Sequence, residues 1–216
     1  MTRNLDQSSA TRLNDSVENV LHKVVQGTAA VTGKEFFSTL VESLASTLGV
    51  RNCAVSELLD NGQLQTLGFF RDDQLQPNIQ YDPVGGPCGE VLTVNDYYCP
   101  REIQTLFPNH PVLSALEADS YVGVCLKNAD GDILGNLIVI DSYPILDRQL
   151  HESILKIFAA RATAELERQR TTLELQQLNE ELEERVEQRT ADLQGTLQEL
   201  KQTQAQLVQS EKMSSL

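Results

Sequence analysis

The sequence predicts an α+β fold, in which an antiparallel sheet is flanked by helices and followed by one long C-terminal helix. Apolar residues recur at helical spacing near both ends of the chain, and in the middle they alternate with polar residues. Proline is absent from the last third of the chain, which holds a single glycine. With 216 residues, 40% of them hydrophobic, the chain can bury one core of ordinary size.

These patterns divide the chain into four predicted segments. Residues 1–11 are polar and are expected to be disordered. Residues 12–32 carry an amphipathic helical pattern. Residues 33–165 form the α+β domain, and residues 166–216 continue as a coiled-coil helix.

The predicted domain begins with a helix over Glu35–Leu48, whose apolar residues share one side. Two hairpins follow, the first turning at an Asn-Gly step that favours positive φ. The predicted hairpin strands are Cys53–Leu59, Leu64–Phe70, Ser120–Lys127 and Ile133–Asp141. Between the hairpins, residues 72–119 are rich in proline and glycine, which predicts short helices and one strand near Tyr97–Cys99.

The region Ile145–Leu216 is predicted to be one helix of roughly 100 Å, because nothing in it interrupts a helix rich in Leu, Glu and Gln. Such a helix cannot bury its apolar stripe within one small domain, so a parallel homodimer is expected. The predicted dimer seam consists of Leu175, Leu178, Leu182, Val186, Leu193, Leu197, Leu200 and Leu207. Leu175–Leu182 and Leu193–Leu207 each follow a heptad spacing, and the eleven-residue step from Leu182 to Leu193 between them relaxes the left-handed supercoil locally. This step is either a point where two packings compete or an ordinary irregularity.

Charge and cysteine usage exclude several classes of partner. The formal net charge of −14 argues against nucleic acid or an anionic membrane surface, because both would repel the chain. No apolar stretch is long enough to span a bilayer, and the N-terminus does not look like a signal peptide. The four cysteines follow no metal-binding spacing, so no metal is expected. They are expected to be free thiols, which indicates a reducing cytoplasmic location.

Several motifs, taken in order, resemble a GAF domain over residues 33–165. They are Phe37–Leu48, the two hairpins, Pro87–Leu92, Phe107-Pro108, Ser120–Val124, Gly135–Asp141 and the helical segment Phe158–Arg168. Downstream, Leu178–Thr190 resembles the signalling-helix linker of bacterial sensor histidine kinases, of the kind found in cyanobacteria, and Ser210–Leu216 resembles the start of their dimerisation helix. The resemblance implies the sensory and linker part of a two-component sensor histidine kinase, with the kinase region C-terminal to it. No enzymatic activity is expected of these 216 residues themselves.

Aromatic and polar residues around the insertion are candidates for a ligand pocket, because tyrosines offer apolar faces with polar tips. The candidates are Tyr81, Cys88, Tyr98, Cys99, Phe107, His110 and Tyr121. An equally good interpretation is that these side chains close the domain over its own core.

The sequence does not identify a cofactor. Covalent bilin attachment to such domains uses a Cys-His pair, but the corresponding helix Pro111–Ala118 contains neither residue. The signature of cyclic-nucleotide-binding GAF domains is also missing. Haem binding would require His110 as the iron ligand. This histidine lies between Pro108 and Pro111 and is expected to be a loop residue.

Two other functions stay open. Cys88 is expected at the start of a short helix, where the helix dipole lowers the pKa of a thiol, so Cys88 with Cys99 could act as a redox sensor. Alternatively, the chain is a structural dimerisation module whose pocket is filled by its own side chains.

Overall fold

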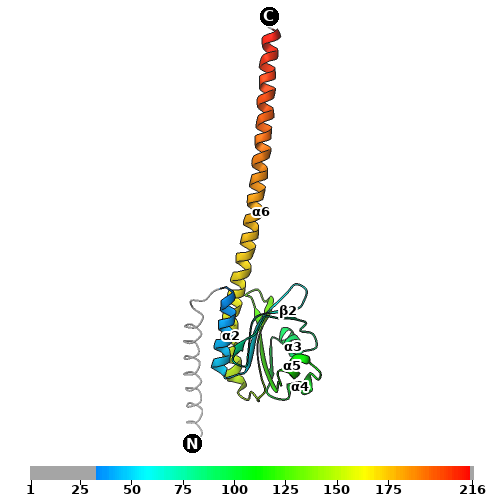
Figure 1. The fold of residues 1–216 in the computed structure, drawn as a ribbon, viewed down its shortest axis with the longest axis vertical. Helices are drawn as coiled ribbons and strands as arrows, with labels where there is room; N and C mark the ends of the chain where they lie inside the picture. The colour runs from blue at the N-terminus through cyan, green and yellow to red at the C-terminus, as the bar shows by residue number, and fades with distance from the viewer. Residues whose placement is uncertain (1–32, 215–216) are drawn as a thin grey trace. The chain divides into compact units, whose positions relative to one another are not determined.

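The structure is a computed structural model and describes residues 33–214 (Figure 1). The predicted disordered segment 1–11 and the predicted helix 12–32 lie outside the described residues. The helices are α2 (Lys34–Leu48), α3 (Pro87–Val94), α4 (Ile103–Leu106), α5 (Pro111–Ala115) and α6 (Arg148–Ser214). The strands are β1 (Asn52–Leu58), β2 (Leu64–Arg71), β3 (Gln74–Leu75), β4 (Gln80–Tyr81), β5 (Asp96–Cys99), β6 (Ser120–Lys127) and β7 (Ile133–Asp141).

The seven strands form one antiparallel sheet in the order β3-β2-β1-β7-β6-β5, with β4 paired to β2. This confirms the predicted α+β fold, and both predicted hairpins are present. In the first hairpin the Asn61 side chain accepts a hydrogen bond from the Gln63 amide at 3.0 Å, and Gly62 adopts φ +82°. Pairing of β1 with β7 joins the two hairpins into one sheet.

Helices cover both faces of the sheet (Figure 1). On one face, α2 and the first part of α6 enclose an apolar core that includes Leu40, Leu137 and Phe158. We call this side the helix face. On the other face, the short helices α3, α4 and α5 cover a second core that includes Tyr121 and Ile138, and we call it the cavity face. Because successive residues of a strand point to opposite sides, each central strand contributes to both cores.

Helix α2 approaches the sheet very closely at Gly68 of β2. A Cβ atom on Gly68 would lie 2.5 Å from the Phe37 carbonyl oxygen, which is shorter than real contacts of this kind. The absence of a side chain therefore lets the helix backbone rest directly on the strand, while Leu40 and Leu44 fill the core beside it.

Helix α6 begins at Arg148, three residues later than predicted. The side chain of Asp147 accepts a hydrogen bond from the Leu150 amide at 3.0 Å and caps the helix there. Leu155, Phe158 and Leu166 are buried on the helix face.

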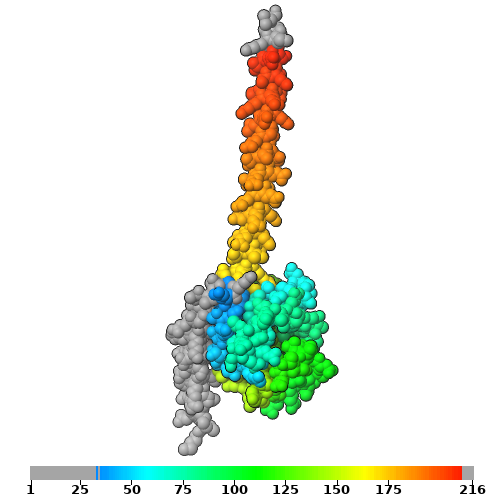
Figure 2. Space-filling view, in the orientation of Figure 1, coloured from blue at the N-terminus to red at the C-terminus, as the bar shows by residue number. Residues whose placement is uncertain are grey.

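The compact unit that contains the sheet ends at Arg168, and a second unit begins at Gln169. Within this second unit, α6 is a single exposed helix (Figure 2), and its leucines from Leu173 to Leu207 are 47–62% exposed.

The proline- and glycine-rich insertion folds into β3, β4, α3, β5, α4 and α5. The strand predicted near Tyr97–Cys99 is confirmed as β5. The two-residue strands β3 and β4 were not predicted, because two residues are too short for an alternating pattern.

Candidate functional site

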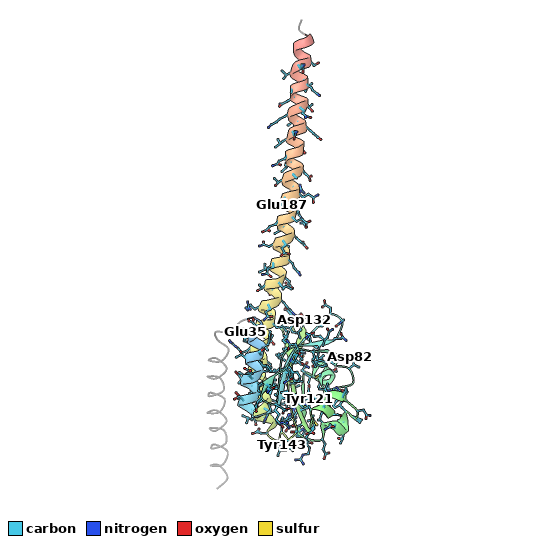
Figure 3. All side chains as sticks on the ribbon, viewed as in Figure 1. Glu35, Asp82, Tyr121, Asp132, Tyr143 and Glu187 are labelled. Carbon is cyan, nitrogen blue, oxygen red and sulfur yellow. The ribbon has the colours of Figure 1, made fainter. Side chains whose placement is uncertain are left out.

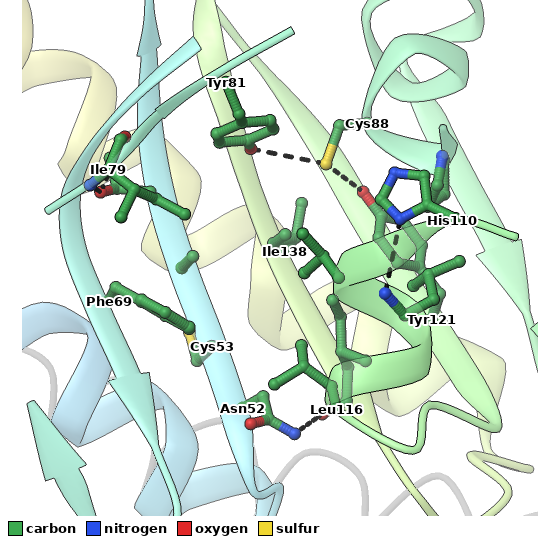
Figure 4. Close-up of a pocket in the computed structure, with 16 residues that line it drawn as sticks. Asn52, Cys53, Phe69, Ile79, Tyr81, Cys88, His110, Leu116, Tyr121 and Ile138 are labelled. Atoms are coloured by element: carbon green, nitrogen blue, oxygen red, sulfur yellow. Dashed lines mark hydrogen bonds between the residues drawn. The ribbon is translucent and has the colours of Figure 1, made fainter. Parts of the chain in front are cut away.

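A cavity of about 60 Å³ lies between the cavity face of the sheet, α5 and the chain around β4 (Figure 4). Its floor is formed by side chains of β1, β6 and β7, including Ala54, Tyr121 and Ile138. Leu113 and Leu116 of α5 and its flank close one side, and Phe69 and Ile79 close the other. The walls are therefore mostly apolar, with a few polar atoms at defined places.

Four of the seven candidate pocket residues line this cavity: Tyr81, Cys88, His110 and Tyr121. They come from β4, α3, the N-cap of α5 and β6, so the insertion folds back over the sheet and brings them together. Tyr121 is fully buried inside the domain (Figure 3).

The other three candidates, Tyr98, Cys99 and Phe107, do not line the cavity. Tyr98 points to the helix face, where its hydroxyl donates to the Ile145 carbonyl at 2.6 Å. The strand alternation of β5 explains this, because Tyr97 and Cys99 occupy the cavity face and Tyr98 must face away. Cys99 is buried and donates to the Arg101 carbonyl, and Phe107 packs edge-on against Tyr97 with ring centroids 6.2 Å apart.

The Cys88 sulfur is the centre of a buried polar cluster. The hydroxyls of Tyr121 and Tyr81 donate to it at 3.4 and 3.5 Å (Figure 4). The Tyr81 hydroxyl also lies 3.4 Å from Ser56 Oγ. Burial raises the pKa of the Cys88 thiol, and these hydroxyls lower it by a smaller amount. Helix α3 does begin at Pro87, as expected, but burial moves the pKa of this thiol upward and not downward as predicted.

Asn136 completes this cluster, and sequence reasoning missed it. It is fully buried on β7, and its amide lowers the pKa of both Cys88 and Tyr81, although neither amide atom makes a hydrogen bond of normal geometry to any described residue. The signal was present in the sequence, since an asparagine interrupts the apolar run Leu134–Ile140.

Asn52 of β1 is the second polar residue that was missed. Its side chain is 3% exposed, lines the cavity, and donates from Nδ2 to the Ile140 carbonyl at 3.2 Å (Figure 4). Its Oδ1 accepts no hydrogen bond from any residue that the structure describes. A buried acceptor of this kind costs stability unless a partner satisfies it.

His110 sits at the edge of the cavity and caps α5. Its Nδ1 accepts from the Leu113 amide at 3.4 Å, and burial lowers the pKa of the imidazole. The ring lies over Gly86, where a Cβ atom would come within 2.5 Å of Nε2. Nδ1 is thus engaged by the chain itself, and Nε2 lies against the backbone of Gly86.

Over residues 33–214, no group of histidine, cysteine and acidic side chains is arranged to hold a metal ion. The same part of the chain contains no helix with both the length and the apolar composition needed to cross a bilayer.

An antiparallel sheet with two helices on one face and a small cavity under short helices on the other defines the class of this domain as α+β. The model of the GAF domain family matches residues 32–166, and the chain belongs to this family. GAF domains are sensory domains of signalling proteins such as phytochromes.

Solved structures show the same fold at low sequence identity. The GAF domain of an Acinetobacter phosphoenolpyruvate-protein phosphotransferase is 15% identical, with a TM-score of 0.58 over 74% of this chain and 96% of that one. The nlh2 GAF domain of A. aeolicus in an inactive state is 14% identical, with a TM-score of 0.57 over 73% of this chain and 99% of that one. The bacteriophytochrome RpBphP3 from R. palustris is 9% identical, with a TM-score of 0.55 over 71% of this chain and 37% of that one. A search of curated proteins finds no match.

Proposed function

We propose that this chain is the sensory and signal-transmitting part of a two-component sensor histidine kinase, and that it acts as a parallel homodimer. In this proposal a small ligand binds in the cavity of the GAF domain, and the second part of α6 pairs with the same segment of another copy. The observation that carries it is the row of exposed apolar side chains along α6.

The exposure of these side chains argues for a partner. The eight predicted seam residues are 47–62% exposed, although they are leucines and a valine. Burying one such side chain against another helix is worth about 1.5–3 kcal/mol. A second copy of the chain presents the same spacing and so matches this stripe in register, which makes it the natural occupant.

The spacing also describes the expected pair. Leu175, Val186, Leu197 and Val208 are separated by eleven residues each, so the step noticed between Leu182 and Leu193 belongs to a longer repeat. Eleven residues over three turns give 3.67 residues per turn, which favours a nearly straight pair with a weak right-handed supercoil. Arg189 lies on the same stripe, between Leu178 and Leu200, and weakens the seam where it would meet its counterpart.

The link to a histidine kinase rests on the likeness of Leu178–Thr190 to the signalling-helix linker of that family. The paired helices would have two packings, and each would go with one conformation of the GAF domain. A ligand in the cavity would shift the equilibrium between them by binding one of these conformations more tightly than the other. We expect no ATP-dependent phosphorylation by these 216 residues, and incorporation of labelled phosphate would contradict this.

The proposal is tested by measuring the particle mass with light scattering as the protein elutes from a size-exclusion column. At micromolar concentration we expect particles of twice the 24.0 kDa chain mass. Leu193→Lys should give single chains, because it places a charge on the seam. Arg189→Leu should give a tighter dimer. Gln198→Lys adds the same charge away from the stripe and serves as the matched control, which should stay dimeric. Single chains from the unmodified protein would overturn the proposal.

A further inference from the structure

The cavity offers a ligand walls that are mostly apolar and carry no fixed charge. Large apolar side chains from β2, β7 and the region of α5 line it: Phe69, Leu113, Leu116, Ile138 and Ile140. None of the described lining residues is a lysine, arginine, aspartate or glutamate. A charged ligand would lose its hydration without gaining an ionic partner, so the walls favour an uncharged one.

The hydroxyl and thiol groups around the cavity are already engaged by the protein. The Thr66 hydroxyl accepts a hydrogen bond from the Ile79 amide at 2.7 Å. The hydroxyls of Tyr81 and Tyr121 both donate to the Cys88 sulfur. These polar groups therefore bind one another or the backbone.

Asn52 and His110 are the remaining polar residues of the lining. Asn52 Nδ2 donates to the Ile140 carbonyl, and Oδ1 is buried, so that a molecule in the cavity does not reach it. His110 Nδ1 accepts from the Leu113 amide, and Nε2 lies against the backbone of Gly86. A ligand with an N–H or O–H group would thus give up hydrogen bonds to water without replacing them. The same shortage of polar partners disfavours water as the occupant.

The volume of the cavity limits the ligand to a few atoms. Benzene binds in an apolar protein cavity of about 150 Å³, which amounts to about 25 Å³ for each of its carbons. At that ratio the cavity of about 60 Å³ holds a molecule of about two or three non-hydrogen atoms. Ile79 and Val112 line the cavity and are also 42% and 37% exposed, so they stand where such a molecule would enter from solvent.

We propose that the cavity binds a short hydrocarbon of about two or three carbons, held only by the burial of its apolar surface. Binding of this kind strengthens with the apolar area removed from water, and a three-carbon chain buries more of it than dioxygen does. This proposal rests on the proposed function, because it names the chemical class of the ligand that the GAF domain would sense.

NMR titration of the full chain under gas pressure tests the ligand class by following the backbone amides of β1 and β7. Propane should bind saturably and about fourfold more tightly than ethane, because it buries one further CH₂ group. Ethanol has as many non-hydrogen atoms as propane but should bind at least about tenfold more weakly, because its hydroxyl finds no partner. Pentane should bind more weakly than propane, because it exceeds the volume of the cavity.

Three variants locate the binding site. Ala54→Leu fills the cavity from β1 and should abolish the binding of propane. Ala115→Leu is the matched control, because it adds the same side chain at an exposed position of α5, and propane should still bind. Leu116→Ala removes part of the wall and should let pentane bind, which keeps the location testable if Ala54→Leu does not fold. A thermal unfolding transition for each variant verifies that it is folded.

The ligand class would be overturned by no saturable binding of propane, or by ethanol, pentane or dioxygen binding more tightly than propane. Unchanged binding of propane in folded Ala54→Leu, or no binding of pentane by folded Leu116→Ala, would overturn the location. Failure here differs from failure of the proposed function, because the latter shows as single chains in light scattering whether or not hydrocarbons bind.

Discussion

The two faces of the sheet are built from the same strands but have different contents. On the helix face, Leu137 and Val139 of β7 are buried among other apolar side chains of α2 and α6. On the cavity face, the alternate residues Asn136, Ile138 and Ile140 border a polar cluster or the cavity.

This difference indicates how one small domain combines stability with binding. The helix face supplies well-packed apolar burial, which contributes most to stability. The cavity face can then tolerate buried amide atoms without partners and an unfilled volume, each of which costs free energy. The following predictions test whether the two faces really divide these tasks.

The largest effect is expected from a cavity-creating substitution on the helix face. Phe158→Ala should lower the free energy of unfolding by about 3–5 kcal/mol, because Phe158 is fully buried in that core. Ile138→Ala on the cavity face should cost less, about 2 kcal/mol, because part of its surroundings is already empty. Urea unfolding of both variants measures this, and equal losses would remove the distinction between the faces.

A smaller effect of opposite sign is expected at Asn136. Asn136→Leu should raise the free energy of unfolding by about 1–3 kcal/mol, because it removes two buried amide atoms that lack hydrogen-bond partners of normal geometry in the described structure. Chemical denaturation compares the variant with the unmodified chain. A clear loss of stability would mean that this amide is satisfied in solution and that the cavity face is as well packed as the other.

Thiol reactivity should separate buried from accessible sulfur on both faces. Burial raises the pKa of Cys53 on the helix face and of Cys88 on the cavity face, so little thiolate forms at neutral pH. Cys125 is only half-buried. With iodoacetamide at pH 7.5, Cys125 should react about tenfold or more faster than either, as followed by peptide mass spectrometry. Fast alkylation of Cys88, or its oxidation by mild peroxide, would favour the redox-sensor alternative.

The smallest effect concerns pH and His110. Burial lowers the pKa of His110 below its ordinary value of 6.5, so just below that pH the unfolded chain binds more protons than the folded one. The free energy of unfolding should therefore fall as pH drops through this window, and it should fall less steeply in His110→Gln. Thermal unfolding at several pH values between 7 and about 5 checks the slope. Identical slopes would mean that His110 is no less solvated than in the unfolded chain.

Much of the fold could be predicted, because its signals are local. The Asn61-Gly62 step and the alternating residues on either side specify the first hairpin without reference to the rest of the chain. The start of α6 was placed three residues early, because the capping contact of Asp147 depends on geometry that composition does not report.

The site was harder to predict, because it depends on which side each strand residue faces. The four-residue strand β5 is too short to show its own phase, so Tyr98 was assigned to the wrong face. The pKa of Cys88 depends on Tyr121, 33 positions away, and on burial by the folded insertion. Asn52 became recognisable as a site residue only once both faces of the sheet were known to be covered. Asn136, in contrast, already stands out in the sequence because it interrupts an apolar run.

The contact between Gly68 and Phe37 has a consequence for anyone altering this domain. Even the smallest side chain at position 68 would push the helix backbone away from the strand, and a screen of all substitutions should find no tolerated replacement there. The exposed turn at Asn61 should accept many. A different helix in place of α2 could therefore pack at the same distance from β2 only if position 68 stayed glycine.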